Sequence, residues 1–96
     1  MPISLPSHGY PDMLTFYFRP KCGLCREIEG PMLQYAARYH VAVRRVNIDE
    51  DKNAFASYWD KIPVIEITGG PILYEPIDRE VLKNAIREVG SAGKEE

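Results

Sequence analysis

Cys22 and Cys25 are the residues whose type and spacing could do chemistry, and they are the only cysteines in the chain. A thiolate attacks sulfur, so two thiols three positions apart can exchange a disulfide with a partner. Residues 16–25 read FYFRPKCGLC, which leads an apolar run into the pair and then into a helical pattern. The first sulfur is therefore predicted to lie at a helix N-terminus, where unpaired N–H groups and the helix dipole favour negative charge.

The two sulfurs are expected to play different parts. Arg19, Lys21 and Arg26 bring positive charge close to Cys22, and we expect the pKa of its thiol to lie below the ~8.5 of a free cysteine. Cys25 lies one helical turn later on the apolar side, where it can attack a mixed disulfide formed on Cys22. The spacing thus supplies one attacking and one resolving sulfur. Arg19 and Lys21 have an alternative reading as charges that only solvate a loop.

The length and composition suit a single α/β domain. The chain has 96 residues, a formal net charge of −2 and a pI near 5.7, which gives no general attraction to nucleic acid or to an anionic membrane. Residues 1–12 lack the features of a signal peptide, and no apolar run approaches the ~18 residues that a membrane span needs. We expect a cytoplasmic monomer in which paired cysteines are reactive or metal-binding rather than a permanent crosslink.

The periodicity of apolar residues predicts the order β-α-β-α-β-β-α. Strands are expected at 13–18, 41–48, 62–68 and 72–74, and residues 13–18 should be central and covered on both faces. The adjacent Arg44 and Arg45 mark 41–48 as an edge strand. Asp78 should cap a final helix whose buried face comprises Val81, Leu82, Ala85, Ile86 and Val89.

The limits of the domain follow from the polar ends and from the glycines. Residues 1–12 are predicted to form a flexible lead-in, residues 13–90 the folded domain, and residues 91–96 a polar tail after a helix that Gly90 ends. Gly69 and Gly70 predict a tight hairpin. Asp49 to Asp51 suggest a helix cap before a short helix, on which Trp59 is interpreted as a core or lid residue.

This organisation resembles the glutaredoxin-like branch of the thioredoxin-fold family. The resemblance covers about residues 13–89 and rests on the YFRPKCGLC segment, the VNID end of the second strand, the IPVI segment and the Gly-Gly hairpin. It implies a four-stranded mixed sheet of order 2-1-3-4, with the last strand antiparallel, flanked by helices. It also implies that the Ile62–Pro63 bond is cis beside the sulfurs and that the backbone of Ile62 pairs with a bound thiol partner. Arg19 matches the basic position that helps glutaredoxins hold the glutathione carboxylate.

The sequence departs from the family pattern at three places. Phe16 stands where thioredoxins carry a buried aspartate, and Gly23-Leu24 replaces the Pro-Tyr between glutaredoxin cysteines. The segment 75–78, EPID, replaces the glycine-rich acidic motif that grips the other end of glutathione. Glutathione is therefore a possible co-substrate against which these departures argue.

Two classes of function follow from these patterns. The first is a thiol-disulfide oxidoreductase that needs no organic cofactor and takes a disulfide-containing protein or a small thiol as substrate, with an unidentified reductant. The second is a redox-responsive or metal-binding adaptor that holds a partner without turnover. Zinc would need four ligands, and His8 and His40 are poorly placed to complete a site with two cysteines. We therefore assign no metal site.

Overall fold

The computed structural model describes residues 13–94, with side chains described as far as Gly90. The predicted lead-in at 1–12 lies outside the described residues. The elements are β1 (Met13–Phe18), α1 (Gly23–Tyr39), β2 (Ala42–Asn47), the 3-10 helix η2 (Ile48–Glu50), α2 (Lys52–Tyr58), β3 (Val64–Ile67), β4 (Ile72–Tyr74) and α3 (Arg79–Lys94). This order confirms the predicted succession of strands and helices.

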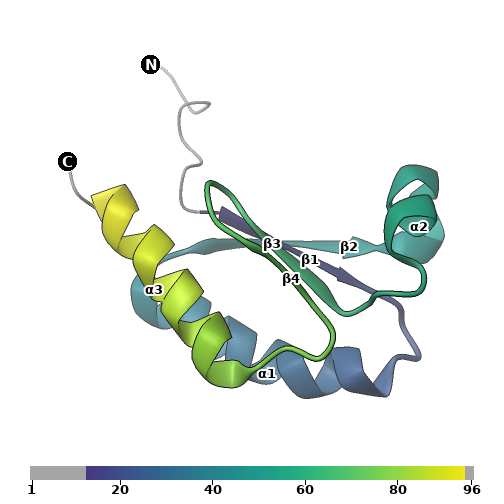
Figure 1. Cartoon of the computed structure of the whole chain (residues 1–96), viewed down its shortest axis with the longest axis horizontal. Helices are drawn as coiled ribbons and strands as arrows, with labels where there is room; N and C mark the ends of the chain where they lie inside the picture. The colour runs from purple at the N-terminus through teal and green to yellow at the C-terminus, as the bar shows by residue number, and fades with distance from the viewer. Residues whose placement is uncertain (1–12, 95–96) are drawn as a thin grey trace.

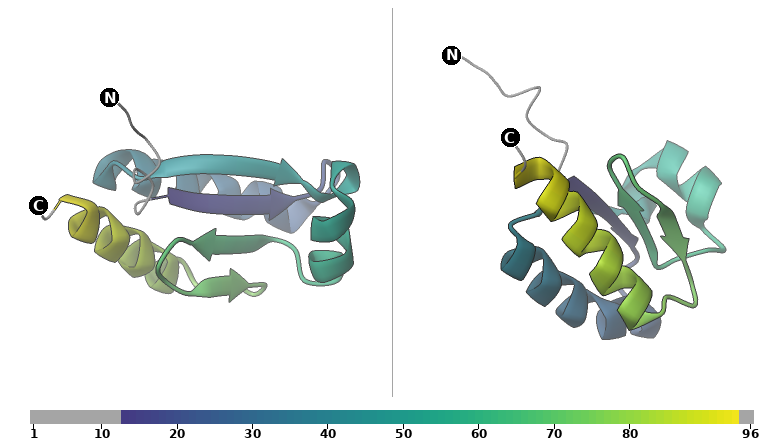
Figure 2. Two further views of the ribbon diagram at one scale, coloured as in Figure 1. Left: turned by 90° about the horizontal axis from the view of Figure 1, so that it is seen from above. Right: turned by 60° about the vertical axis from the view of Figure 1, so that its left-hand side comes forward.

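The four strands form one mixed sheet in the order β2-β1-β3-β4, as predicted. Strand β1 pairs in parallel with β2 and antiparallel with β3, and β3 pairs antiparallel with β4. The left panel of Figure 2 shows the strands side by side in this order. Strand β2 is therefore an edge strand, as the adjacent arginines indicated.

Helices α1 and α3 cover one face of the sheet, and the main core lies between them and the strands (Figure 1). Alternate residues of β1, Leu14 and Phe16, are fully buried there, opposite Ile67 and Ile65 of β3. Phe16, at the position of the thioredoxin aspartate, is thus part of an apolar core. Helix α1 runs through Pro31 without interruption and contributes Cys25, Ile28, Met32 and Ala36 to this core.

The other face of β1 is less covered than predicted. Met13, Thr15 and Tyr17 are only half-buried on that face, and the short helix α2 packs there through the ring of Tyr58, whose centroid lies 4.6 Å from that of Tyr17. The Tyr17 hydroxyl donates to Oε1 of Glu66 at 2.9 Å. Partial burial and this hydrogen bond to a carboxylate raise the pKa of Tyr17 to about 12.

The arginine pair of β2 is divided between the two faces of the sheet. The Nε of Arg45 lies 2.7 Å from Oε2 of Glu29 on α1, and its guanidinium stands 4.4 Å from the centre of the Phe18 ring. Arg44 points to the other face, beside Tyr17 and Glu66. Adjacent charges are tolerated here because alternate strand residues face opposite sides and β2 is at the sheet edge.

The predicted end of the last helix at Gly90 is wrong. Helix α3 continues to Lys94, so its last residues are helical rather than a tail that begins at Ser91. A Cβ on Gly90 would lie 2.5 Å from the carbonyl oxygen and 3.0 Å from the Cβ of Tyr39 at the end of α1. This glycine therefore permits close approach of two helices and does not terminate one.

Two apolar side chains are more exposed than the sequence predicted. Val81 on α3 is 50% exposed, whereas Leu82 and Ile86 on the same helix are fully buried. Trp59, which ends α2, is 55% exposed and is not a core residue. The cap itself is as predicted, since Asp78 accepts from the backbone amides of Glu80 and Val81.

Within residues 13–94, no helix combines the length and the apolar character required to cross a bilayer.

We predict that Gly90→Ala lowers the free energy of unfolding by about 1–3 kcal/mol, because the added methyl group would force α3 away from Tyr39. Helix propensity alone would favour alanine by about 1 kcal/mol, so the expected sign is opposite to that of an exposed site. Urea denaturation measures the change. Gly30→Ala is the control, because an added Cβ there meets nothing within 4 Å. An equal or smaller loss at Gly90 than at Gly30 contradicts the proposed contact.

A second prediction concerns alkaline pH. The pKa of Tyr17 is raised in the folded state, so folding stability from this group is present below about pH 10 and is lost as pH rises toward 12. Tyr17→Phe should therefore flatten the decline of unfolding free energy in that window. Glu66→Gln should flatten it too, because it removes the carboxylate that accepts the hydrogen bond. Unchanged slopes in both variants would refute the role of this pair.

Candidate active site

The segments predicted to build the site meet at one end of the sheet. Strand β1 leads into Cys22, β2 leads into Asp49, β4 leads into Glu75, and β3 begins at this same end just after Pro63. The pairing explains this arrangement, because Tyr17 near the end of β1 lies opposite Val64 at the start of β3. Four distant segments of sequence thus converge around the two cysteines.

Cys22 and Cys25 form a disulfide, with their Cα atoms 5.2 Å apart. Cys22 is the N-cap of α1, as predicted, and its Sγ accepts a hydrogen bond from the backbone N–H of Cys25 at 3.0 Å. An amide that points at this sulfur favours a thiolate when the disulfide is reduced. Cys22 is half-buried, whereas Cys25 is only 3% exposed. The two sulfurs therefore differ in access to solvent.

Pro63 and Ile62 stand at the same end of the sheet as the disulfide. The Ile62–Pro63 bond is cis, which confirms the prediction from the IPVI segment. Pro63 is buried, and Ile62 is partly buried and packs against the same core as Cys22. Ile62 thus lies at the same end of the sheet as the cysteines and shares their core. The cis Glu75–Pro76 bond, which follows β4, is an additional feature that the sequence analysis does not predict.

Arg19 is held by an acidic residue that follows β2 and by an aromatic ring of α2. Its Nε lies 2.9 Å from Oδ1 of Asp49, and its guanidinium stands 5.4 Å from the centre of the Phe55 ring. Asp49 was interpreted as part of a helix cap, but Asp51 is the residue that caps α2, through the amide of Ala54. The order VNID at the end of a parallel neighbour of β1 was the signal that could have placed Asp49 beside Arg19.

The other basic residues lie on the same side of Cys22. Lys21 is exposed and lines a hollow of about 320 Å³ together with Arg19, Pro20 and Asp49. Arg26 makes a long contact, 3.5 Å, with the carbonyl oxygen of Pro20. Because Arg19 is paired with Asp49, Lys21 and Arg26 are the exposed basic residues that remain next to Cys22 in the sequence.

A metal site that combines the cysteines with His40 has no support in this geometry. Cys22 and His40 cap opposite ends of α1, which has 17 residues and is therefore about 25 Å long. Among the described residues, no group of three or more cysteine, histidine or acidic side chains is arranged to hold a metal ion. His8 lies outside the described residues.

Three features of this structure define a glutaredoxin-like protein of thioredoxin fold. They are a Cys-x-x-Cys disulfide at the start of the helix that follows β1, a mixed sheet of order β2-β1-β3-β4, and a cis-proline just before β3. The chain belongs to the family described as "Glutaredoxin-like domain (DUF836)", whose model matches residues 13–87. The family inferred from the sequence is therefore confirmed.

One solved structure matches this chain in both sequence and fold. The X-ray structure of the Northeast Structural Genomics target protein XcR50 from X. campestris is similar to this chain, with 28% sequence identity and a TM-score of 0.55. The similarity covers 82% of this chain and 96% of that chain. No curated protein matches the sequence. The family and the cysteine pair together indicate a redox type of function.

Proposed function

We propose that this protein is a dithiol-disulfide oxidoreductase that uses Cys22 as nucleophile and Cys25 as resolving thiol. The observation that carries the proposal is the asymmetry of the pair. Cys22 caps α1 and is accessible, whereas Cys25 is almost completely buried and donates its amide to the sulfur of Cys22. The first sulfur can meet a partner, and the second can meet only the first.

The exchange conserves atoms and electrons without a resident cofactor. The Cys22 thiolate attacks one sulfur of the substrate disulfide, forms a mixed disulfide and expels the other substrate sulfur as a thiolate that takes up a proton. Cys25 then loses its proton and attacks Cys22, which closes the Cys22–Cys25 disulfide and releases the second substrate thiol. Two electrons pass to the substrate, and a thiol or dithiol reductant returns them in the reverse exchange.

The surroundings of the pair support both steps. Lys21 and Arg26 add positive charge beside Cys22, which favours its thiolate, while the pairing of Arg19 with Asp49 removes Arg19 as a free cation. Ile62 offers backbone groups at the same end of the sheet, where an extended substrate could pair. The tuning of Cys22 therefore falls mainly to Lys21, Arg26 and the helix start.

Glutathione is a poor candidate for the natural partner. The amides of Glu80 and Val81 at the start of α3, which could otherwise receive a carboxylate, already bond to Asp78. Arg19 is likewise already paired with Asp49. We therefore propose a protein or peptide disulfide as substrate.

Substitution of each cysteine tests the proposal. With insulin as the disulfide substrate and dithiothreitol as reductant, wild-type protein should accelerate reduction, and Cys22→Ser should fall to the uncatalysed rate because a serine hydroxyl does not attack sulfur. Cys25→Ser should accumulate a mixed disulfide that mass spectrometry detects. The chain has no third cysteine, so an adduct on that variant can only be on Cys22.

Three results would each overturn one part of the proposal. An adduct on Cys25 in the Cys22→Ser protein would show that the buried thiol can meet substrate directly. Binding of insulin without any acceleration by wild-type protein would instead favour an adaptor that holds a partner without turnover. Rapid turnover of Cys25→Ser with glutathione would contradict the argument against glutathione.

A further inference from the structure

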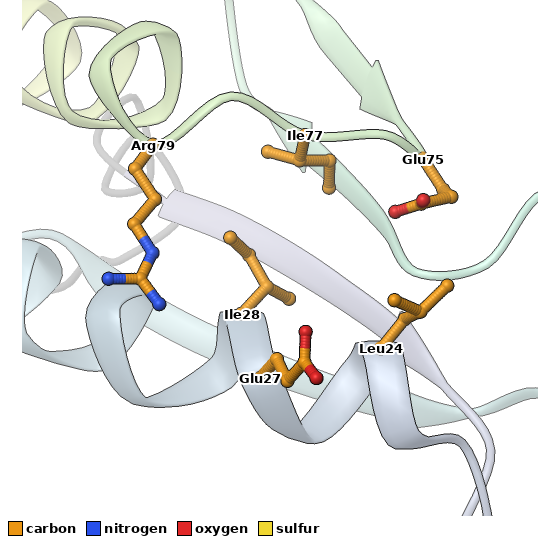
Figure 3. A pocket seen from close by; sticks show the side chains of 6 residues that line it. All are labelled: Leu24, Glu27, Ile28, Glu75, Ile77 and Arg79. Atoms are coloured by element: carbon orange, nitrogen blue, oxygen red, sulfur yellow. The ribbon is translucent and has the colours of Figure 1, made fainter.

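A small groove opens between the first turns of α1 and the segment that joins β4 to α3 (Figure 3). Its volume is about 110 Å³, well below the ~300–1,000 Å³ of a site that encloses a small molecule. It therefore suits one side chain of a larger partner. The lining residues are Leu24, Glu27, Ile28, Glu75, Ile77 and Arg79.

The groove adjoins the reacting sulfurs. Leu24 stands between Cys22 and Cys25 in the sequence, is 47% exposed, and forms one end of the groove. A substrate residue next to the cysteine bound at Cys22 is within reach of this end, because neighbouring Cα atoms in a chain are about 3.8 Å apart. The groove is thus placed to contact the residues that flank a substrate cysteine.

Its lining combines apolar walls with carboxylates. Leu24, Ile28 and Ile77 provide the apolar surface, and Glu27 and Glu75 approach from opposite walls, one from α1 and one from the β4–α3 segment (Figure 3). Among the side chains of residues 13–90, no basic nitrogen lies within 4.0 Å of either carboxylate, so neither forms an ion pair.

This combination matches a lysine or arginine side chain. Such a side chain lays its methylene stem along apolar surface and keeps its charge in a polar setting. Arg79 stands at the end of the groove away from Leu24 and repels a cation there, so the bound charge would stay near Glu27 and Glu75 (Figure 3). An anion is disfavoured because the two glutamates repel it and Asp78 occupies the first amides of α3.

We propose that the groove is a specificity subsite for a lysine or arginine that flanks the reacting cysteine of a peptide or protein substrate. The inference rests on the proposed oxidoreductase function. It also gives the site two electrostatic sides, since Lys21 lies toward the β2 edge of the sheet, beside the Arg19–Asp49 pair, while Glu75 follows β4 at the opposite edge. A substrate with unlike charges around its cysteine would bind in one orientation.

The test uses three synthetic peptides that differ only in the residues on both sides of a single cysteine, which are lysine, glutamine or glutamate. Each cysteine is capped as a disulfide with 2-nitro-5-thiobenzoate. Attack of reduced Cys22 on the peptide sulfur expels the coloured thiolate, and Cys25 then displaces the peptide thiol, which takes up the proton of Cys25. Release of colour measures the second-order rate constant.

We expect the reduced wild-type protein to react roughly fivefold faster with the lysine peptide than with the glutamate peptide, as two partly exposed ion pairs would give. Glu27→Gln/Glu75→Gln should abolish or reverse this preference. The control variant Glu80→Gln/Glu88→Gln removes the same number of negative charges from α3, outside the groove, and it should keep the preference for the lysine peptide.

Each outcome bears on one claim. A wild-type preference that is absent, or that both double variants lose equally, overturns the subsite and leaves the oxidoreductase function intact. Failure of all three peptides to react with Cys22 overturns the proposed function itself. A preference that only Glu27→Gln/Glu75→Gln removes, and that salt weakens, supports the subsite.

Discussion

The site depends on the pairing of β1 with a parallel neighbour on one side and an antiparallel neighbour on the other. This pairing brings the C-terminal ends of β1, β2 and β4 and the start of β3 to the same end of the sheet. Hydrogen bonds between backbones fix the register, so the positions of Cys22, Asp49, Pro63 and Glu75 follow from a ladder that is independent of their own side chains. The side chains at this end of the sheet can therefore change while the backbone hydrogen bonds between the strands are kept.

The distribution of charge around Cys22 follows from the same topology. The 3-10 helix η2 after β2 supplies Asp49, which pairs with Arg19, and the segment after β4 supplies Glu75 toward the opposite edge of the sheet. Because β2 and β4 are opposite edges of the sheet, the positive charge of Lys21 beside the Arg19–Asp49 pair and the negative charge of Glu75 lie on different sides of the site. Unlike charges on two sides of a site favour one orientation of a charged partner, and this is the basis of the proposed subsite.

Periodicity and spacing sufficed to predict the order of elements and the position of Cys22 at the start of a helix, whereas the family resemblance implied the strand order and the cis bond at Pro63. They failed where two segments distant in sequence touch. Gly90 has the local appearance of a helix end, and only the carbonyl of Tyr39 reveals why a glycine is needed inside α3. Asp49 resembled a capping residue because its partner, Arg19, lies 30 positions earlier in the chain, just after β1. Local patterns describe what a segment prefers, whereas these contacts depend on which segments the sheet brings together.

The close contact at Gly90 means that both ends of α1 are held by other parts of the structure. One end is capped by Cys22 and carries Leu24, and the other presses its backbone against α3 at Tyr39, about 25 Å away. Because an uninterrupted helix is stiff over this length, a small tilt at the Tyr39 end moves the first turn relative to the cis-proline. Evolutionary change at a helix crossing remote from the sulfurs can therefore shift the first turn of α1, including Leu24, without any substitution beside Cys22.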